Sequence, residues 1–332
     1  MNMPKVSVIV PIYKVEKYIE HCAKSLFEQS LDDIEYIFVN DCTPDRSVEL
    51  LLRTAEAYPG RTNRISVIHL ECNSGLAAVR AIGMKAATGE YVIHCDSDDW
   101  VDPGLYETMY LAAKDNDADI VMCDVMNEYS GQSIPKIYAC HTNLARQAIK
   151  DMYRNYFDMY TVNKLVRRSI YTKYAIYPYE GINMWEDNGL MYRIFYHAGR
   201  LVSVHDVYYH YNRCNENALT HNYKRSSVEQ MIRCATALEE FFLCKEDGVA
   251  YASTVDMLKF CAKINLITDH YSGIREYRHV FPGSERCLKK LDRRAFSRKG
   301  RFRLFFVEHH LAWLFVSLFK VRNFIIGFVC LK

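Results

Sequence analysis

Short runs of β-branched and aromatic residues alternate with longer amphipathic segments over the first 125 residues of the chain. The short runs are typical of buried strands, and the longer segments repeat apolar residues at helical spacing. This alternation predicts an α/β fold with a mostly parallel sheet flanked by helices on both faces. The expected strands are residues 6–10, 34–39, 65–70, 91–94 and 119–123. The expected helices are residues 16–29, 45–58, 76–87 and 103–116.

The pattern changes after residue 140. We predict that residues 141–175 are helical, that residues 185–198 form a helix with acidic residues at its start, and that residues 201–211 are a strand. Residues 224–279 are expected to be mostly helical. The length of 332 residues predicts two domains, at about 150 residues for each domain.

The formal net charge of +2 hides an uneven distribution. Residues 1–140 contain 12 Lys and Arg against 22 Asp and Glu, a net of −10, which leaves +12 for residues 141–332. Ligands of parallel sheets bind outside the carboxyl ends of the strands. The residues that follow the expected strands include Asn40-Asp41, Asn73-Ser74-Gly75 and the acidic run Asp96–Asp99. The negative charge of the first half is therefore partly directed at one crevice.

The acidic run is the sharpest local signal. Asp96 and Asp98 are two residues apart at a strand end, so both side chains can reach the crevice. Paired carboxylate oxygens suit Mg²⁺ or Mn²⁺ bridged to phosphates. A turn with a helix cap explains the same residues, since aspartate is common there. Repulsion between near-adjacent carboxylates favours the metal.

Six segments, taken in order, resemble family 2 glycosyltransferases of the GT-A fold, of the type that builds bacterial surface polysaccharides. The resemblance covers about residues 5–215. Each segment alone is a weak signal, but the ordered combination is specific. The segments are Ser7–Tyr13, with the first strand and a Pro-x-Tyr turn; Asn40–Ser47; Asn73–Arg80; Asp96–Asp99, with the D-x-D metal motif; Asn163–Leu165; and Trp185–Asp187, with the Glu-Asp acceptor-side motif.

The resemblance implies a role for each matching position. In the donor site, the nucleobase would be lined by Pro11, Tyr13 and Glu16, with Asp41 accepting a hydrogen bond from uracil. The rest of the nucleotide would be held by Arg80, Asp96 and Ser97. The cation would bind Asp98 together with Asp96, and His210 is a third candidate ligand, for which a packed aromatic strand is an equal explanation. Asp187 would be the general base and Glu186 would orient the site beside it.

Two residues depart from the family pattern in the Asn-Asp loop. Cys42 stands where glycine is usual, and Pro44 stands where threonine is usual. Cysteine resists a positive φ, so we expect the loop to be shaped differently. Lys14, where asparagine is frequent, could alter the donor pocket.

The resemblance implies an inverting, Mn²⁺- or Mg²⁺-dependent transfer from a UDP-sugar to a saccharide or lipid-linked saccharide, for capsule, O-antigen or another surface polysaccharide. Residues 1–220 would form the GT-A domain, with a Rossmann-like nucleotide-binding half (1–125) and an acceptor-side half (126–220). Residues 221–332 would be a helical extension. Alternatives are an inactive nucleotide-sugar-binding module at the membrane and a nucleotidyltransferase, although no Gly-rich phosphate loop follows the first strand. The lack of G-x-G-x-x-G there also disfavours a dehydrogenase.

The C-terminal tail is basic and aromatic. Residues 289–303 contain eight basic residues and one acid, Asp292, and lead into an aromatic-rich segment. Such a combination suits an anionic membrane surface. Core packing and nucleic-acid binding are the alternatives that the composition leaves. We expect residues 289–332 to bind an anionic membrane surface, with no nucleic-acid partner.

The chain is expected to act in the cytoplasm, at the inner face of the cell membrane. Its first residues show no signal-peptide pattern, and no stretch of 18 apolar residues lacks charges. The 12 cysteines include no C-x-x-C pair, so structural zinc is not expected. The sequence leaves the oligomeric state open.

Overall fold

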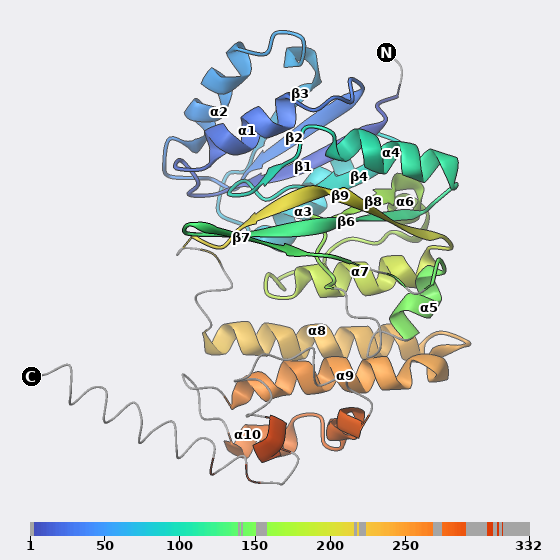
Figure 1. The fold of residues 1–332 in the computed structure, drawn as a ribbon. Helices are drawn as coiled ribbons and strands as arrows, with labels where there is room; N and C mark the ends of the chain where they lie inside the picture. Colours follow the sequence, from blue (N-terminus) through green and yellow to red (C-terminus); the bar gives the residue numbers. More distant parts are fainter. Residues whose placement is uncertain are drawn as a thin grey trace, which may run out of the picture. The chain divides into compact units, whose positions relative to one another are not determined.

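The computed structural model describes residues 3–138, 140, 142–150, 158–215, 218, 224–267, 274–289, 304–307, 311 and 314 (Figure 1). The chain divides into two compact units. Unit 1 comprises residues 1–149 and 157–222, and unit 2 comprises residues 150–156 and 223–332.

A single sheet organises unit 1. Among the described residues it contains nine strands in the order β3-β2-β1-β4-β8-β6-β9-β5, with β7 paired to β6. The strands are β1 (Val6–Ile12), β2 (Ile34–Asn40), β3 (Ile65–His69), β4 (Tyr91–His94), β5 (Trp100–Val101), β6 (Ile120–Tyr129), β7 (Gln132–Lys136), β8 (Lys164–Arg167) and β9 (Leu201–Asn212).

The first half of the sheet has the expected parallel order. Strand β1 pairs in parallel with β2 and β4, and β2 pairs in parallel with β3. The other half is mixed, because β6 and β9 are parallel to each other while β8, β7 and β5 pair antiparallel to their neighbours. The carboxyl ends of β1, β2 and β4 therefore lie at one edge of the sheet, where ligands of such sheets bind. The predicted α/β fold is confirmed.

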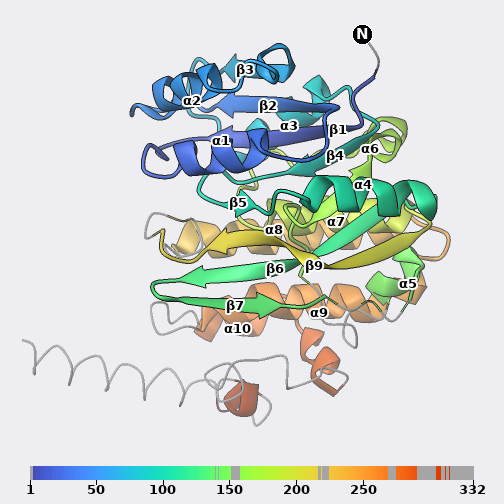
Figure 2. The same ribbon diagram turned by 45° about the horizontal axis from the view of Figure 1, so that its top comes forward.

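Helices cover both faces of the sheet in unit 1. Figure 2 shows α1 and α4 on one face and α3 on the other. Helix α7 lies on the face of α3, since side chains of the two helices bond to each other. The helices are α1 (Ile19–Phe27), α2 (Ser47–Glu56), α3 (Leu76–Ala86), α4 (Leu105–Asp115), α5 (Ala145–Lys150), α6 (Arg168–Tyr174) and α7 (Glu186–His197).

The predicted helical stretch 141–175 is wrong in its centre. Strand β8 lies there, between β4 and β6, and only the short helices α5 and α6 flank it. Residues 151–157 lie outside the described residues. A four-residue strand whose first three residues are buried, Lys164–Val166, carries no alternation that distinguishes it from a buried helix. The sequence pattern therefore could not separate the two.

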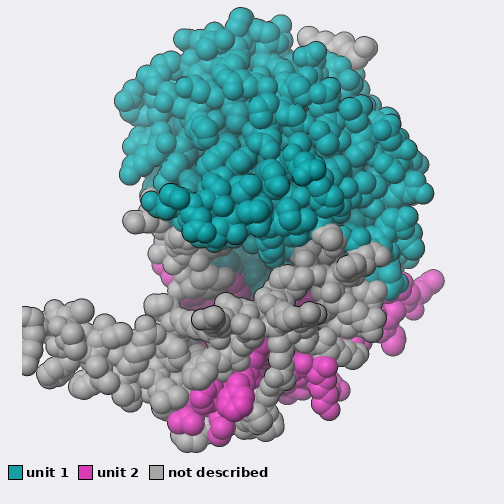
Figure 3. All heavy atoms as spheres, viewed as in Figure 1, with its two compact units in different colours: residues 1–149, 157–222 teal, residues 150–156, 223–332 magenta. Residues whose placement is uncertain are grey.

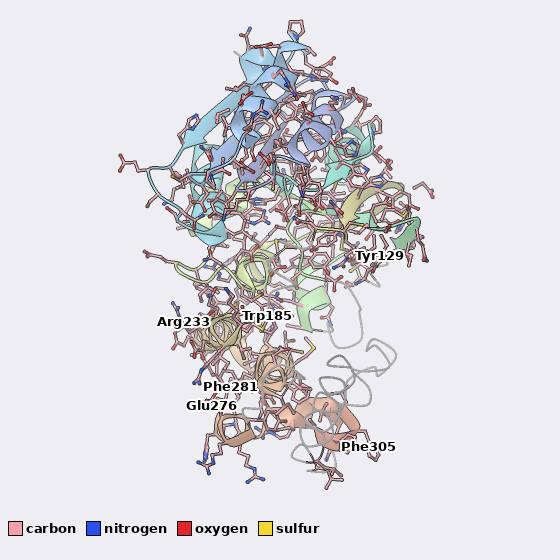
Figure 4. The ribbon with its side chains drawn as sticks, turned by 90° about the vertical axis from the view of Figure 1, so that its left-hand side faces the viewer. Tyr129, Trp185, Arg233, Glu276, Phe281 and Phe305 are labelled. Carbon is pink, nitrogen blue, oxygen red and sulfur yellow. The ribbon has the colours of Figure 1, made fainter. Side chains whose placement is uncertain are left out.

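Unit 2 is helical, as predicted for residues 224–279. Its described helices are α8 (Arg225–Leu243), α9 (Ala252–Lys263) and α10 (Ile274–His279) (Figure 1). Figure 3 shows the described residues of this unit in magenta. The core of unit 2 includes Phe260 and also Leu304, Phe306 and Val307 from the start of the predicted tail. Phe305 is instead 50% exposed (Figure 4). Core packing thus holds for these three tail residues.

Most of the basic stretch and of the aromatic segment lies outside the described residues. Within the part of the chain that the structure describes, no helix has the length and apolarity needed to cross a bilayer.

A glycine sets how closely α3 approaches β1. An ideal Cβ on Gly83 would lie 2.4 Å from Cγ2 of Ile9, a buried and β-branched side chain. Ile9 cannot turn away easily, because β-branching restricts its rotamers. The spacing between α3 and the sheet therefore requires glycine at this position.

We expect Gly83→Ala to lower the free energy of unfolding by about 1–3 kcal/mol through overpacking. The sign is diagnostic, because alanine in a helix interior is otherwise favoured over glycine by about 1 kcal/mol. Gly104→Ala is the control, since a Cβ there meets nothing within 4 Å. Urea unfolding of both variants measures the difference, and an unchanged or raised stability of Gly83→Ala would contradict this packing.

Candidate active site

The loops that follow β1 and β2 are tied to each other. The Lys14 amide donates to Oγ1 of Thr43 at 2.8 Å, and the Glu16 amide donates to Oδ2 of Asp45 at 3.1 Å. In return, the Arg46 amide donates to Oε2 of Glu16 at 3.3 Å. The predicted nucleobase residue Glu16 is thereby fixed against the Asn-Asp loop.

Pro11 and Tyr13 lie at the carboxyl end of β1. Pro11 is half-buried and stands opposite Val39 of β2. Tyr13 is 40% exposed, and Nζ of Lys14 lies 5.1 Å from the centre of its ring. The Tyr13 ring is thus accessible to a planar ligand, and the ammonium group of Lys14 lies beside it.

Cys42 adopts the backbone conformation that glycine favours. Its φ is +55°, and Lys14 in the neighbouring loop has a φ of +56°. The Thr43 amide then donates to Oδ1 of Asn40 at 2.9 Å, which closes the turn. The expectation that cysteine would reshape this loop by avoiding a positive φ is therefore wrong.

The Asp41 carboxylate caps the start of α3. It accepts hydrogen bonds from the Ser74 amide at 2.6 Å and from the Gly75 amide at 3.0 Å. Gly75 has a φ of +85°, and a Cβ there would lie 2.5 Å from the Asn183 side chain. Oδ1 of Asn183 in turn accepts the Ala77 amide at 3.0 Å. Each Asp41 oxygen keeps a lone pair for a ligand donor.

Arg80 of α3 joins the two acidic motifs. Its Nη2 lies 2.7 Å from Oδ1 of Asp96, and its Nε lies 3.2 Å from Oε1 of Glu186. The arginine is 2% exposed, and its Nη1 has no hydrogen-bond partner. Burial alone would lower the pKa of Arg80, but the carboxylates of Asp96, Glu186 and Asp187 raise it. The structure therefore brings Arg80, Asp96 and Glu186 together.

The Glu-Asp motif forms the first turn of α7. Trp185, directly before it, has a φ of +70°, an uncommon conformation for a bulky residue (Figure 4). Glu186 is buried, whereas Asp187 is half-buried and accepts the amide of Asn188 at 2.7 Å. Burial, and next the Asp187 carboxylate, raise the pKa of Glu186 to about 8, and burial also raises the pKa of Asp187. Burial therefore shifts both pKa values in the same direction, upward.

Burial divides the acidic run into two groups. Asp96 and Asp98 are half-buried, whereas Ser97 and Asp99 are 4% and 2% exposed. Oδ2 of Asp99 accepts the Tyr209 hydroxyl at 2.5 Å, and its Oδ1 accepts a backbone amide of β9. Both Asp99 oxygens thus serve the fold, which leaves Asp96 and Asp98 as the carboxylates that a ligand can reach.

The donor set of Asp96 and Asp98 fits a hard divalent cation. Burial, and next the negative charge of Asp96, raise the pKa of Asp98, so a cation bound between the two carboxylates would relieve their repulsion. Among the described residues, no group of three or more His, Cys, Asp or Glu side chains could hold a metal ion by itself. A cation here would take further ligands from a diphosphate and water, which is the usual mode of Mg²⁺.

The structure does not bring His210 to Asp98. His210 follows Tyr209 on β9, so the two side chains point to opposite faces of the sheet. Its Nδ1 lies 2.7 Å from Oε1 of Glu128, and its Nε2 lies 3.0 Å from Oδ1 of Asp102. Carboxylates thus engage both ring nitrogens, and we leave His210 out of the metal site.

Sequence reasoning missed a buried lysine near the acid pair. Nζ of Lys164 donates to the carbonyl oxygens of Asp158 and Tyr160 and to Oδ1 of Asn163, each at 2.8 Å. Burial lowers the pKa of Lys164 to about 7, and the charge of Asp187 is among the groups that oppose this shift. The segment 163–165 resembles the family, but the resemblance implied no role for Lys164.

Asn183, Asn212 and Asn215 were also missed. Each bonds to a residue of the site or to the start of α3. Isolated asparagines near turns have no spacing that marks them, so only the folded chain reveals these contacts.

Glu186→Gln tests the buried carboxyl group through the pH dependence of stability. The folded protein holds a proton on Glu186 that the unfolded chain releases above its ordinary pKa of 4.5. This stabilisation is complete below that value and is lost as the pH rises towards about 8. We expect the free energy of unfolding to fall over this range in the wild type and to fall less in Glu186→Gln. Glu56→Gln, at an exposed position of α2, is the control, and equal slopes in all three proteins would contradict this environment.

Known proteins share both sequence and fold with this chain. The chain is 35% identical over 263 residues to the uncharacterized glycosyltransferase EpsJ of Bacillus subtilis, covering 75% of each protein. It is 34% identical over 235 residues to the putative glycosyltransferase EpsH of the same organism, covering 69% of this chain and 66% of EpsH.

Solved structures show the same fold at low identity. TarS residues 1–349 of Staphylococcus aureus, in complex with UDP-GlcNAc, matches with a TM-score of 0.66 and 18% identity, over 96% of this chain and 91% of TarS. The mannosyltransferase PcManGT of Pyrobaculum calidifontis, with GDP-Man and Mn²⁺, matches with a TM-score of 0.52 and 16% identity, over 98% and 88%. The model of glycosyl transferase family 2 matches residues 7–207, and the chain belongs to this family.

Proposed function

We propose that the protein transfers a sugar from a UDP-sugar to a hydroxyl group of a saccharide or lipid-linked saccharide, with inversion, in the synthesis of a surface polysaccharide. The transferred sugar would be a hexose or an N-acetylhexosamine. The observation that carries the proposal is the Arg80 bridge between Asp96 and Glu186, 2.7 Å and 3.2 Å long. It ties the donor-side acidic motif to the acceptor-side acidic motif within one buried cluster.

The donor site would lie along the carboxyl ends of β1, β2 and β4. Tyr13 offers an accessible ring, and Asp41 keeps acceptor capacity for the uracil N–H. Arg80 and Asp96 would hold the rest of the nucleotide, beside the buried Ser97. The fold is shared with TarS, whose solved complexes contain UDP-GlcNAc and UDP, and this supports UDP as the nucleotide.

Asp98 and Asp96 would hold Mn²⁺ or Mg²⁺. A bound cation would neutralise the charge that develops on the departing diphosphate. The half-buried position of both carboxylates leaves them accessible, and their mutual repulsion favours a cation. The Mn²⁺ in the PcManGT complex, a protein of the same fold, is consistent with this site.

Asp187 would accept the proton of the attacking hydroxyl group. Its raised pKa makes it a better proton acceptor than an exposed aspartate, and its half-buried position leaves it reachable. Glu186 would orient the site through Arg80 and would not itself touch the substrate. A single displacement with the base on the face opposite the leaving group inverts the anomeric carbon.

We expect Asp187→Asn to lower kcat by about 10²- to 10⁴-fold, the usual contribution of a general base. Asp98→Asn should abolish activation by Mn²⁺ or Mg²⁺. The assay is release of UDP from a panel of UDP-sugars with saccharide acceptors. Asp115→Asn, at an exposed position of α4, is the control. Full turnover by both site variants would refute the site, and wild-type binding of UDP without turnover would favour an inactive binding module.

We further propose that the basic stretch 289–303 binds an anionic membrane surface at the inner face of the cell membrane. Its eight basic residues carry this part of the proposal. Deleting the whole tail is a poor test, because Leu304, Phe306 and Val307 belong to the core of unit 2. A sharper test keeps the full chain and neutralises basic residues of the stretch 289–303.

The test replaces Arg293, Arg294, Arg298 and Lys299 by glutamine. Binding to phosphatidylglycerol vesicles should fall by at least about tenfold, since each basic residue near an anionic surface contributes about 1 kcal/mol. The control replaces four exposed lysines of unit 1, Lys17, Lys24, Lys85 and Lys114, by glutamine. Co-sedimentation with anionic and with neutral vesicles measures both, and equal binding by the tail variant and the wild type would sink the assignment.

A further inference from the structure

The end of β9 holds the acidic run in place. The Tyr209 hydroxyl accepts the Asp96 amide at 3.1 Å and donates to Asp99. Three residues later on the same strand, the Asn212 amide donates to Oδ1 of Asp99 at 2.8 Å. The backbone of the run is thus fixed from one side by a strand that is more than 100 residues away in the sequence.

Asp98 receives two further contacts from this part of the chain. Nδ2 of Asn212 donates to the Asp98 carbonyl oxygen at 3.1 Å. Nδ2 of Asn215 donates to Oδ2 of the Asp98 carboxylate at 2.7 Å. Asn215 is 6% exposed, so its amide is held within the structure. Asn212 therefore bonds to the backbone of Asp98, and Asn215 bonds to its side chain.

The Asn215 contact fixes the rotation of the Asp98 carboxylate. An amide nitrogen can only donate, so Oδ2 is committed to Asn215 along one direction. The other oxygen then points in a defined direction relative to the half-buried carboxylate of Asp96. Partners that orient ligating carboxylates in this way commonly tune metal affinity.

We propose that Asn215 is a positioning residue that orients the Asp98 carboxylate for the divalent cation. This inference rests on the proposed function, because it assumes that Asp98 binds the cation. The role differs from that of Asp99 and Tyr209, whose contacts fix the loop backbone and the fold. Asn215 instead acts on the side chain of Asp98, one of the two carboxylates that would hold the cation.

The test measures Mn²⁺ binding directly, in the full chain with UDP present, from the free Mn²⁺ signal in electron paramagnetic resonance. Asn215→Ala removes the donor, and Asn215→Leu removes it while keeping a similar side-chain volume. Both should weaken Mn²⁺ binding by about 10- to 100-fold, the usual effect of losing such a partner. In transfer assays, the Mn²⁺ concentration for half-maximal rate should rise by the same factor, while kcat at saturating Mn²⁺ stays near the wild-type value.

Asn127→Ala is the matched control. Asn127 is a buried amide of the same sheet, at 8% exposure, but it bonds to Arg213 and Ile134 and does not touch the acidic run. Its loss should leave Mn²⁺ binding unchanged.

The outcomes separate the inference from the proposed function. Wild-type affinity for Mn²⁺ in both Asn215 variants would overturn the positioning role while leaving the cation site intact. Loss of a cooperative unfolding transition in both would show that Asn215 serves folding alone, which overturns the role as well. A wild type that binds no Mn²⁺ with UDP would remove the cation from the proposed function, and this inference would fall with it.

Discussion

The candidate site depends on the contacts that the buried guanidinium of Arg80 makes with Asp96 and Glu186. This guanidinium connects α3 to the end of β4 and to the start of α7, elements that lie far apart in the sequence. Arginine suits this task because its rigid fork can face two carboxylates at once, which a lysine ammonium cannot reproduce. Buried ion pairs add little net stability, so the bridge is better understood as fixing geometry. Nη1 of the same group is buried and has no hydrogen-bond partner.

Placing a charge in this cluster determines what the neighbouring acids can do. Glu186 is buried against Arg80, so it holds the guanidinium in position. Asp187, one residue later, is half-buried, and its carboxylate accepts the amide of Asn188. The same division runs through the acidic run, where Asp99 is consumed by β9 while Asp98 remains reachable. Each motif contains neighbouring acidic residues, and they differ in burial: one is buried and bonded within the protein, and another is half-buried.

The sequence predicted what depends on local pattern. The parallel strands and the helices between them follow from periodicity, and the ordered motifs imply that Asp41, Arg80 and Asp96 serve one nucleotide site. The sequence could not predict β8, because a short buried strand lacks a distinctive period of apolar residues. Nor could it predict the contact between Asn215 and Asp98, which joins residues 117 positions apart. Such partners are selected by tertiary packing, and an isolated asparagine carries no mark of it.

Part of the backbone strain lies at the edge of the sheet that carries the candidate site. Of the seven non-glycine residues with positive φ that the structure describes, Lys14, Cys42 and Trp185 lie in loops of the candidate site. Such conformations cost about 1–3 kcal/mol each and persist only where the surroundings enforce them. For Lys14 the enforcement is visible, because its loop and the 42–47 loop hold each other through backbone amides. Trp185 is strained directly before Glu186, so its conformation sets the direction in which the acid pair leaves the loop. At these three positions the strained backbone helps to set where the neighbouring side chains point, since a relaxed backbone would direct them elsewhere.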